Sequence, residues 1–385
     1  MARTIFEVEN GVEVIQVTEH PGIKSNIYCE IPWCSSDSRF FVYQQHGDDP
    51  RNPAEYVRCE FGSWKQEPLA RGVVRSGPSI DPQGTCIDQQ GTFYYVHRAR
   101  RNLQHMVRVD LATGHSEPFW EFPEGFKNRG RIVVSGDNRY IVYGVHLGWD
   151  PQRFGIERVD RKTGETEIIH EDSFIWNPHT QLDPGKGNRV LIQHNRGAEF
   201  APDGTRIRKH GPEGNTIFIL EIETGDVTRL QLGRPHTPGT TGHEAWIGQT
   251  GEILVSVHAE DDYTPDKKGN LVAVRPDLPP RSVTNGYRFD HVGTSVCGRY
   301  YTCDDRPTKS IVIGSPHTGD SVFVCRTGAS FGRTQPTHPH PYLSPDLKWV
   351  VFNSDRTGET QLHVARIPEA MIQSIQITKG GSINA

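Results

Sequence analysis

Alternating apolar and polar positions recur along this 385-residue chain in units that lie roughly 40–60 residues apart. Each unit is an alternating run, a polar turn that usually contains Thr-Gly, and a second alternating run. Period-2 alternation bounded by turn residues predicts β-strands, because successive side chains of a strand point to opposite faces. The copies, in chain order, are YVRCEFGSWKQEPL, MVRVDLATGHSEPF, IERVDRKTGETEII, IFILEIETGDVTRL, LVAVRPDLPPRSVT, IVIGSPHTGDSVFV and the shortened LHVARIPEAM.

Seven such units are present, and their first strands begin near residues 57, 107, 157, 217, 271, 311 and 362. Hairpins rich in Val, Ile, Tyr and Phe precede them, for example SGDNRYIVYGV and SPDLKWVVFNS. Four strands per unit and seven units predict an all-β fold, a seven-bladed β-propeller. No linker rich in Gly, Ser or Pro interrupts the repeat, so we expect residues 1–385 to form a single domain.

The fourth unit is longer than the others because it contains the polar segment HNRGAEFAPDGTRIRKHGPEGNT, residues 194–216. Several Arg and His residues lie in this segment, and insertions of this kind in a repeat fold usually carry function. We therefore predict a functional loop here rather than a packing device.

Composition and charge exclude several classes of protein. The net charge is -5 with both signs interspersed, and no basic run predicts nucleic-acid binding. No apolar stretch approaches the length that a membrane span needs, and MARTIFEVENGVEVIQV lacks the pattern of a secretory signal. Seven cysteines form no paired framework, so we expect free thiols and a cytoplasmic protein, as a monomer or homodimer.

The candidate chemistry begins with the segment QPTHPH at the start of the last unit. On a strand, His338 and His340 lie two residues apart and face the same side. Gln335 lies in the entering loop and can turn its amide oxygen toward the same point. Two imidazoles and an amide suit a borderline divalent ion such as Mn, Fe, Ni or Zn. The alternative is that these histidines are solvated loop residues.

Histidines occupy the same place in the three preceding units. His291 lies in DHVGTSVCGRYYTCDD, His243 in TTGHEAWIGQTG and His179 in WNPHTQLDP. Glu244 either orients His243 or points to the other face of its strand. Each histidine alone is readily explained as a residue capping a blade. Because the inner strands of all blades converge on one channel, four consecutive blades with histidine there predict a site.

The motifs GHEAW, NPHTQLDP, DHVGTSVCGRYYTCDD and QPTHPHPYLSPDLKWVVF together resemble the oligogalacturonate lyases, which are seven-bladed propellers with TolB-like repeats. The resemblance covers about residues 170–365. It implies a divalent metal, with Mn²⁺ favoured, and His243 as the catalytic base. The metal ligands that it implies are His291, Gln335, His338 and His340.

The resemblance also implies a reaction. A metal-dependent lyase of this kind cleaves 4-linked oligogalacturonate, or a related acidic oligosaccharide, by β-elimination to a 4,5-unsaturated uronate, as in pectin degradation. A cation on the carboxylate stabilises the charge that develops while the base removes the C5 proton. The carboxylate-binding candidates are Arg196, Arg206 and Arg208, with Arg208 assigned to the catalytic centre, and His179 is expected to line the sugar site.

Two departures from the family pattern leave details open. Ala245 stands where the family has an aromatic residue between Glu and Trp, and the segment after His194 differs. The uronic acid and the correspondence of the arginines therefore stay open. Two other classes also remain: a non-catalytic TolB-like propeller that binds a protein or sugar, and another metal-dependent propeller enzyme such as a lactone hydrolase. Lactone hydrolases usually use carboxylate-rich calcium-type sites, whereas the residues here are rich in imidazole.

Overall fold

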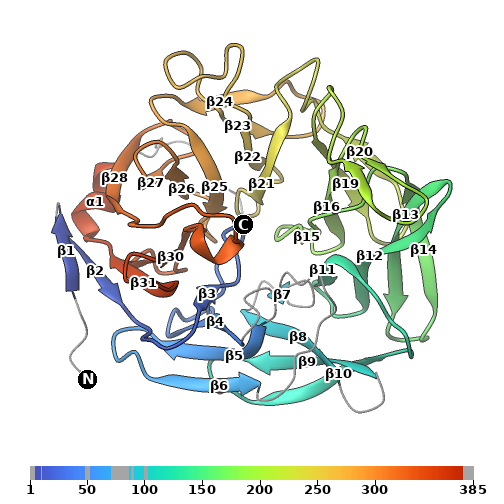
Figure 1. Ribbon diagram of the computed structural model, residues 1–385, viewed down its shortest axis with the longest axis horizontal. Helices are drawn as coiled ribbons and strands as arrows, with labels where there is room; N and C mark the ends of the chain where they lie inside the picture. The colour runs from blue at the N-terminus through green and yellow to red at the C-terminus, as the bar shows by residue number, and fades with distance from the viewer. Residues whose placement is uncertain are drawn as a thin grey trace.

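Seven β-sheets arranged in a ring form the protein in this computed structural model, which describes residues 5–9, 11–47, 53–70, 86–87, 91–98 and 103–375 (Figure 1). The predicted seven-bladed β-propeller is confirmed. The predicted extent of the domain includes both ends of the chain, and these lie outside the described residues.

The blades are numbered in chain order from the first complete sheet. Blade 1 contains β3 (Lys24–Asn26), β4 (Phe40–His46), β5 (Pro53–Glu60) and β6 (Gln66–Ala70). Blade 2 contains β7 (Cys86–Ile87), β8 (Thr92–Arg98), β9 (Gln104–Asp110) and β10 (Ser116–Phe122). Blade 3 contains β11 (Arg129–Val134), β12 (Tyr140–Trp149), β13 (Gln152–Asp160) and β14 (Thr166–Asp172). Blade 4 contains β15 (Gln181–Leu182), β16 (Arg189–His194), β19 (Thr216–Glu221) and β20 (Val227–Arg229).

The remaining blades follow the same order. Blade 5 contains β21 (Thr240–Trp246), β22 (Ile253–Val257), β23 (Leu271–Val274) and β24 (Arg281–Thr284). Blade 6 contains β25 (Phe289–Thr294), β26 (Tyr301–Asp305), β27 (Ser310–Gly314) and β28 (Ser321–Arg326). Blade 7 contains β29 (Tyr342–Leu343), β30 (Trp349–Ser354) and β31 (Gln361–Arg366), with β2 (Val12–Gln16) and β1 (Ile5–Glu9) at its outer side. The 3-10 helix η2 (Gln335–Thr337) precedes β29, and helix α1 (Glu369–Ser374) follows β31.

The seven starting points predicted from the repeat all fall within the third strand of a blade: β5, β9, β13, β19, β23, β27 and β31. The preceding hairpins form the first and second strands. The sequence repeat therefore has the same period as the blades, because one alternating strand and its turn recur in each of them.

The ring is closed by strand β2, which pairs with β31 so that Val14 lies opposite Ala365. The order of this sheet is β1-β2-β31-β30-β29, so the N-terminal segment completes the last blade. This closure was not predicted from the repeat. It pairs the outer edge of β31 and links the two ends of the ring.

The apolar core lies between neighbouring blades. Phe41 of blade 1, Phe93 of blade 2 and Val351 of blade 7 belong to one buried cluster, and similar clusters join the other blades. Both faces of a blade are therefore covered, which explains why β22 is buried at every position. The inner strands are held rigidly by this packing, so residues at their ends have defined positions around the channel.

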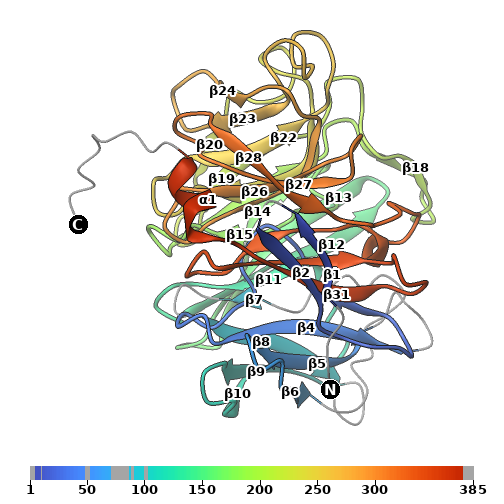
Figure 2. The same ribbon diagram turned by 90° about the vertical axis from the view of Figure 1, so that its left-hand side faces the viewer.

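The long segment within blade 4 forms a separate hairpin of β17 (Glu199–Phe200) and β18 (Arg206–Arg208), which projects from the ring (Figure 2). Six cysteines of the described residues are free thiols, while Cys86 has no described side chain. Among the described residues, no helix is long and apolar enough to cross a membrane.

Candidate metal centre and active site

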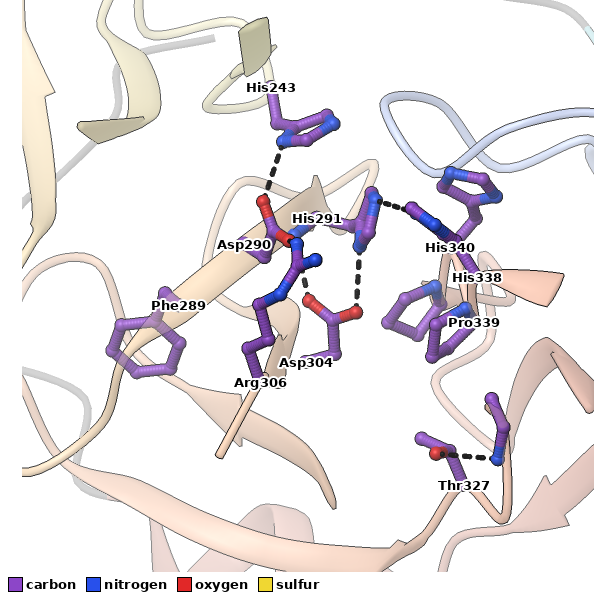
Figure 3. A network of polar contacts seen from close by, with 12 residues as sticks. His243, Phe289, Asp290, His291, Asp304, Arg306, Thr327, His338, Pro339 and His340 are labelled. Atoms are coloured by element: carbon purple, nitrogen blue, oxygen red, sulfur yellow. Dashed lines mark hydrogen bonds and ion pairs between the residues drawn. The ribbon is translucent and has the colours of Figure 1, made fainter. Parts of the chain in front are cut away.

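The structure brings together three of the histidines that the sequence singled out. His291 lies on β25, the innermost strand of blade 6, whereas His338 and His340 lie just before β29 of blade 7. One nitrogen from each of the three rings lies within 4.8 Å of the others (Figure 3). We call these three residues the imidazole cluster.

His291 is positioned by Asp304 on the neighbouring strand β26. A bulge between Phe289 and Val292 interrupts the pairing of β25, and His291 lies within it. The Asp304 carboxylate lies 2.7 Å from Nδ1 of His291 and accepts the backbone N–H of the same residue, also at 2.7 Å. Nδ1 of His291 thus faces Asp304, and Nε2 points toward the other two histidines, where it can bind a cation.

The facing nitrogens of His291 and His338 require a cation or a proton between them. Nε2 of His338 donates to the carbonyl of Gly332 at 3.0 Å, so its Nδ1 carries a lone pair. That Nδ1 lies 3.3 Å from Nε2 of His291. Nε2 of His340 is buried and has no hydrogen-bond partner in the described part of the chain. Three imidazole lone pairs that converge in this way fit a divalent ion with nitrogen ligands.

Burial keeps two members of the imidazole cluster, His291 and His340, uncharged. It lowers the pKa of His291 and of His340 well below the ordinary value of 6.5, and the neighbouring imidazoles act in the same direction. A histidine must be neutral to bind a metal, so the protonation state at neutral pH is the one that a metal site needs.

Two asparagines hold the backbone of residues 338–340. The side-chain amide of Asn353 donates to the carbonyl of His338 at 3.0 Å, and that of Asn26 donates to the carbonyl of His340 at 2.6 Å. His340 has φ of 45°, an unusual value for a residue other than glycine. The two histidines therefore converge, but the predicted reason was wrong, because they do not lie two residues apart on a regular strand. A short 3-10 helix and a left-handed residue bring them together instead.

His243 lies beside the imidazole cluster, on the innermost strand of blade 5. Its ring centroid is 4.3 Å from that of His291. Gly242 has φ of 95° at a bulge between Thr240 and His243, a conformation that favours glycine. The Gly-His pair of the motif thus places the His243 ring at the channel rather than in a regular strand.

A carboxylate orients His243. Nδ1 of His243 lies 3.2 Å from Oδ1 of Asp290 and 3.0 Å from Oγ1 of Thr241. Burial alone would raise the pKa of Asp290, but His243 and Arg306 outweigh burial and hold it well below its usual range. Asp290 is therefore a carboxylate at neutral pH, and it leaves Nε2 as the free nitrogen of His243.

A cavity of about 180 Å³ lies beside these residues and brings together His179, His243 and Gln335 from three blades. Gln335 is the exposed first residue of η2. Most of the lining is polar, and it includes two cationic side chains. The lining residues are Tyr28, Gly130, Arg131, Asn177, His179, Gln193, Lys209, Asn215, Thr241, Gly242, His243 and Gln335.

The three arginines predicted to bind carboxylates lie outside the lining of this cavity. Arg196 donates to the backbone carbonyls of Gly214 and Arg234. Arg206 lies over the ring of Trp176, with 5.1 Å to its centroid.

The third arginine, Arg208, is ion-paired with Glu199 on the same exposed hairpin, at 3.2 Å. The cations that do line the cavity are Arg131 of β11 and Lys209, which follows the hairpin. Lys209 lies in the insertion that the sequence marked as functional, whereas no sequence signal pointed to Arg131.

A second group of titratable residues includes two that line the cavity, Arg131 and His179, and two carboxylates buried behind them. His179 is placed between two buried carboxylates, with its Nδ1 3.4 Å from Glu30 and 3.7 Å from Glu244. Arg131 is ion-paired with Glu30. Glu244 thus points away from His243 and toward His179. We call Glu30, Arg131, His179 and Glu244 the carboxylate cluster.

Neighbouring charges shift the pKa values of the carboxylate cluster. Burial raises the pKa of Glu244 to about 7, and the Glu30 charge adds to this effect. Burial acts in the same sense on Glu30, but Arg131 and His179 outweigh it, so the pKa of Glu30 is lowered. Burial would lower the pKa of His179, yet Glu30 and Glu244 outweigh burial and raise it. His179 therefore favours the imidazolium form.

The fold and the site together define a class of protein: a seven-bladed β-propeller with a candidate metal-dependent active site at its channel. No protein-family model matches the chain. The chain is 25% identical over 408 residues to the oligogalacturonate lyase of Dickeya dadantii (strain 3937), covering 94% of this chain and 95% of that protein. It is also 25% identical over 404 residues to the oligogalacturonide lyase of Pectobacterium atrosepticum, covering 96% of each.

Solved structures show the same fold. The oligogalacturonate lyase from Vibrio parahaemolyticus superposes with a TM-score of 0.70 at 18% identity, covering 96% of this chain and 97% of that one. An oligogalacturonate lyase in complex with manganese superposes with a TM-score of 0.71 at 18% identity and the same coverage. The chain is thus similar to oligogalacturonate lyases over nearly its whole length, and the similarity extends well beyond residues 170–365.

Proposed function

We propose that this protein is a metal-dependent lyase that cleaves a 4-linked oligogalacturonide, or a related oligouronide, by β-elimination to a 4,5-unsaturated uronate. One observation carries the proposal: three convergent imidazole lone pairs lie beside a histidine–aspartate pair and a polar cavity. The likeness to oligogalacturonate lyases over nearly the whole chain supports the same reaction.

We place the metal on His291, His338 and His340, with Gln335 as a further ligand from the cavity wall. Mn²⁺ is the ion that we propose, because a solved oligogalacturonate lyase is in complex with manganese and imidazole and amide donors accept it. A divalent ion on the substrate carboxylate would stabilise the negative charge that develops when C5 loses its proton.

His243 is the base in this proposal. Asp290 accepts from its Nδ1, so Nε2 is the nitrogen that takes the C5 proton. Asp290 also stabilises the imidazolium that forms, and Arg306 at 2.5 Å keeps Asp290 ionised and oriented. The proton acceptor is thus prepared by residues of blades 5 and 6 before a substrate arrives.

Arg131 and Lys209 are the cations that we assign to the substrate carboxylates, because both line the cavity. This assignment replaces Arg208, Arg196 and Arg206, whose guanidinium groups are engaged outside it. A guanidinium and an ammonium at one wall suit a substrate that carries a carboxylate on each sugar.

Several wider proposals follow from the acidic substrate. We propose a role in pectin degradation, in the cytoplasm, which agrees with the six free cysteines of the described residues. We also propose one domain over residues 1–385, a monomer or homodimer, and no nucleic-acid partner. A non-catalytic propeller or a lactone hydrolase would leave the imidazole cluster and the His243–Asp290 pair without a role.

The test is to incubate the purified protein with metal and short oligogalacturonates or glucuronate-containing oligosaccharides, while recording the ultraviolet absorbance of a conjugated unsaturated uronate. Elemental analysis of the same sample should find one divalent metal per chain. We expect His243→Ala to abolish product formation and to retain the metal.

A matched control is His105→Asn, which removes a histidine ion-paired with Glu121 on the outer strands of blade 2, at 3.5 Å. This variant should keep its activity. Wild-type activity in His243→Ala would contradict the base assignment, and no unsaturated product from any uronide would contradict the function.

A further inference from the structure

The carboxylate cluster adjoins the cavity, but neither the proposed metal binding nor the proposed proton removal uses it. Its members come from blades 1, 3, 4 and 5, so it spans the channel. The side chain of Glu30 is 1% exposed and that of Glu244 is 0% exposed. Neither oxygen of Glu244 has a hydrogen-bond partner among the described residues. Two carboxylates buried around one imidazole need positive charge close by to compensate for their loss of solvation.

Charge balance identifies that source. Arg131 supplies one positive charge to the two carboxyl groups, so one further positive charge balances the group when Glu244 is ionised, above about pH 7. A protonated His179 supplies it, whereas a divalent ion beside a neutral His179 would leave an excess charge next to Arg131. The cluster is therefore better described as an imidazolium held by two carboxylates than as a second metal site.

The geometry directs the other edge of His179 into the cavity. Its Nδ1 is buried against the carboxylates, yet the side chain is 20% exposed and lines the cavity together with His243. Tyr28 lies between the two histidines, with ring centroids 6.2 Å from His179 and 6.1 Å from His243. His179 also has φ of 47°, an uncommon conformation that the fold maintains at this position.

β-Elimination needs a proton donor as well as a base, because the departing O4 is a poor leaving group as an alkoxide. In a galacturonide, the C5 hydrogen and O4 project from opposite faces of the sugar ring. One side chain cannot then reach both atoms, so the donor must differ from His243.

We propose that His179 is the general acid of the elimination and donates its Nε2 proton to the glycosidic O4; this inference rests on the proposed lyase function. The C5–H bond breaks as His243 takes the proton, and its electron pair forms the C4–C5 double bond. The C4–O4 bond breaks with its electrons on O4, which receives the proton of His179. Glu30 and Glu244 are positioning residues that keep His179 protonated, and solvent restores both histidines afterwards.

The experiment compares two substrates that differ only in their leaving group. One is a galacturonide whose O4 bears a sugar, and the other is a 4-O-(4-nitrophenyl) galacturonate, whose phenoxide departs without protonation. We expect His179→Gln to lose about 10²–10⁴-fold in kcat on the first substrate and less than about 10-fold on the second. His243→Ala should lose activity on both, because each substrate needs C5 deprotonation.

The pH profile supplies a second readout. The rate of the wild-type protein on the galacturonide should fall at alkaline pH as His179 loses its proton, and this fall should be absent with the nitrophenyl substrate. The charged groups that face His179 are Glu30, Glu244 and Arg131. Glu244→Gln is close to isosteric, and by removing one charge it should move the alkaline fall on the galacturonide to lower pH.

Three results would overturn the assignment. Equal losses by His179→Gln on both substrates would show a role in binding, and an unchanged alkaline fall in Glu244→Gln would show that His179 does not control it. A second equivalent of bound metal that disappears in Glu244→Gln would make His179 a ligand. If the wild-type protein eliminates neither substrate, the proposed function fails with it. Retention of one metal and of a cooperative thermal transition shows that each variant is folded.

Discussion

The imidazole cluster and the carboxylate cluster both contain histidine, but the surroundings of the imidazoles differ. Both are buried at the channel, and both lie next to the cavity that His243 lines. In the first, three imidazoles face each other with no carboxylate between them, and burial favours the neutral form of His291 and His340. In the second, one imidazole lies between two carboxylates, which favour its charged form. The neighbouring charges, rather than burial itself, decide whether a histidine binds a cation or acts as one.

The largest effect should come from breaking the imidazole cluster. His338→Ala removes the lone pair that faces His291, so we expect loss of the metal and a fall in elimination rate of at least about 10³-fold. Chelation of the wild-type protein should give the same loss, and added Mn²⁺ should reverse it only in the wild type. Full activity with no bound metal would refute the distinction between the two clusters.

Removing the cation of the carboxylate cluster should instead lower the stability of the protein. Arg131→Met leaves Glu30 buried without its guanidinium partner, so we expect a loss of about 3–5 kcal/mol in the free energy of unfolding. Urea unfolding measures it. The double variant with Glu30→Gln should recover part of the loss, because the unpaired charge is gone. An unchanged unfolding free energy for Arg131→Met would contradict a structural ion pair.

A smaller effect is expected when the residue that orients the proposed metal ligand His291 is changed. Asp304→Asn keeps an oxygen acceptor for His291 but removes the carboxyl group that faces its Nδ1, so the metal dissociation constant should rise about 10–100-fold. Titration with Mn²⁺ measures the constant. The matched change Asp305→Asn, on the next residue of β26, should leave the metal affinity unchanged. Equal effects of the two changes would contradict the role of Asp304.

The smallest effect concerns the pH dependence of the free energy of unfolding in metal-free protein, which should differ in sign between the two clusters. The pKa of His340 is lowered on folding, so its contribution to stability is present above 6.5 and is lost as pH falls below that value. The pKa of His179 is raised, so its contribution is present below 6.5 and is lost as pH rises through the raised pKa. Urea unfolding of His340→Gln and His179→Gln between about pH 5 and 8 should therefore give opposite slopes relative to wild type. Slopes of the same sign would contradict the assigned protonation states.

The repeat made the architecture predictable. One alternating strand and its turn recur in all seven blades, so the starting points of the third strands followed from sequence alone. The closure by β2 did not, because β2 has an ordinary alternating pattern and its partner β31 lies about 350 residues away in the chain. Nothing in a local pattern tells a strand which distant edge it pairs with.

The histidines were predictable for the same reason as the blades. Equivalent positions in consecutive units must meet where inner strands converge, so His179, His243 and His291 could be placed before any coordinates. The arginines were not, because a loop insertion has no repeat to define its direction. Arg208 is ion-paired with Glu199 on the hairpin itself, while Lys209 and Asn215 are the residues of that segment that line the cavity.

The sequence by itself thus determined the number of blades, the position of each histidine within its blade and the kind of ion that imidazoles accept. Only the tertiary structure decided which charged groups surround each histidine. Asp304 faces His291 from the adjacent strand, Asp290 faces His243 from the next blade, and Glu30 reaches His179 from a blade across the channel. Electrostatic energy depends on distance through space, and such distances between blades are set by the closure of the ring.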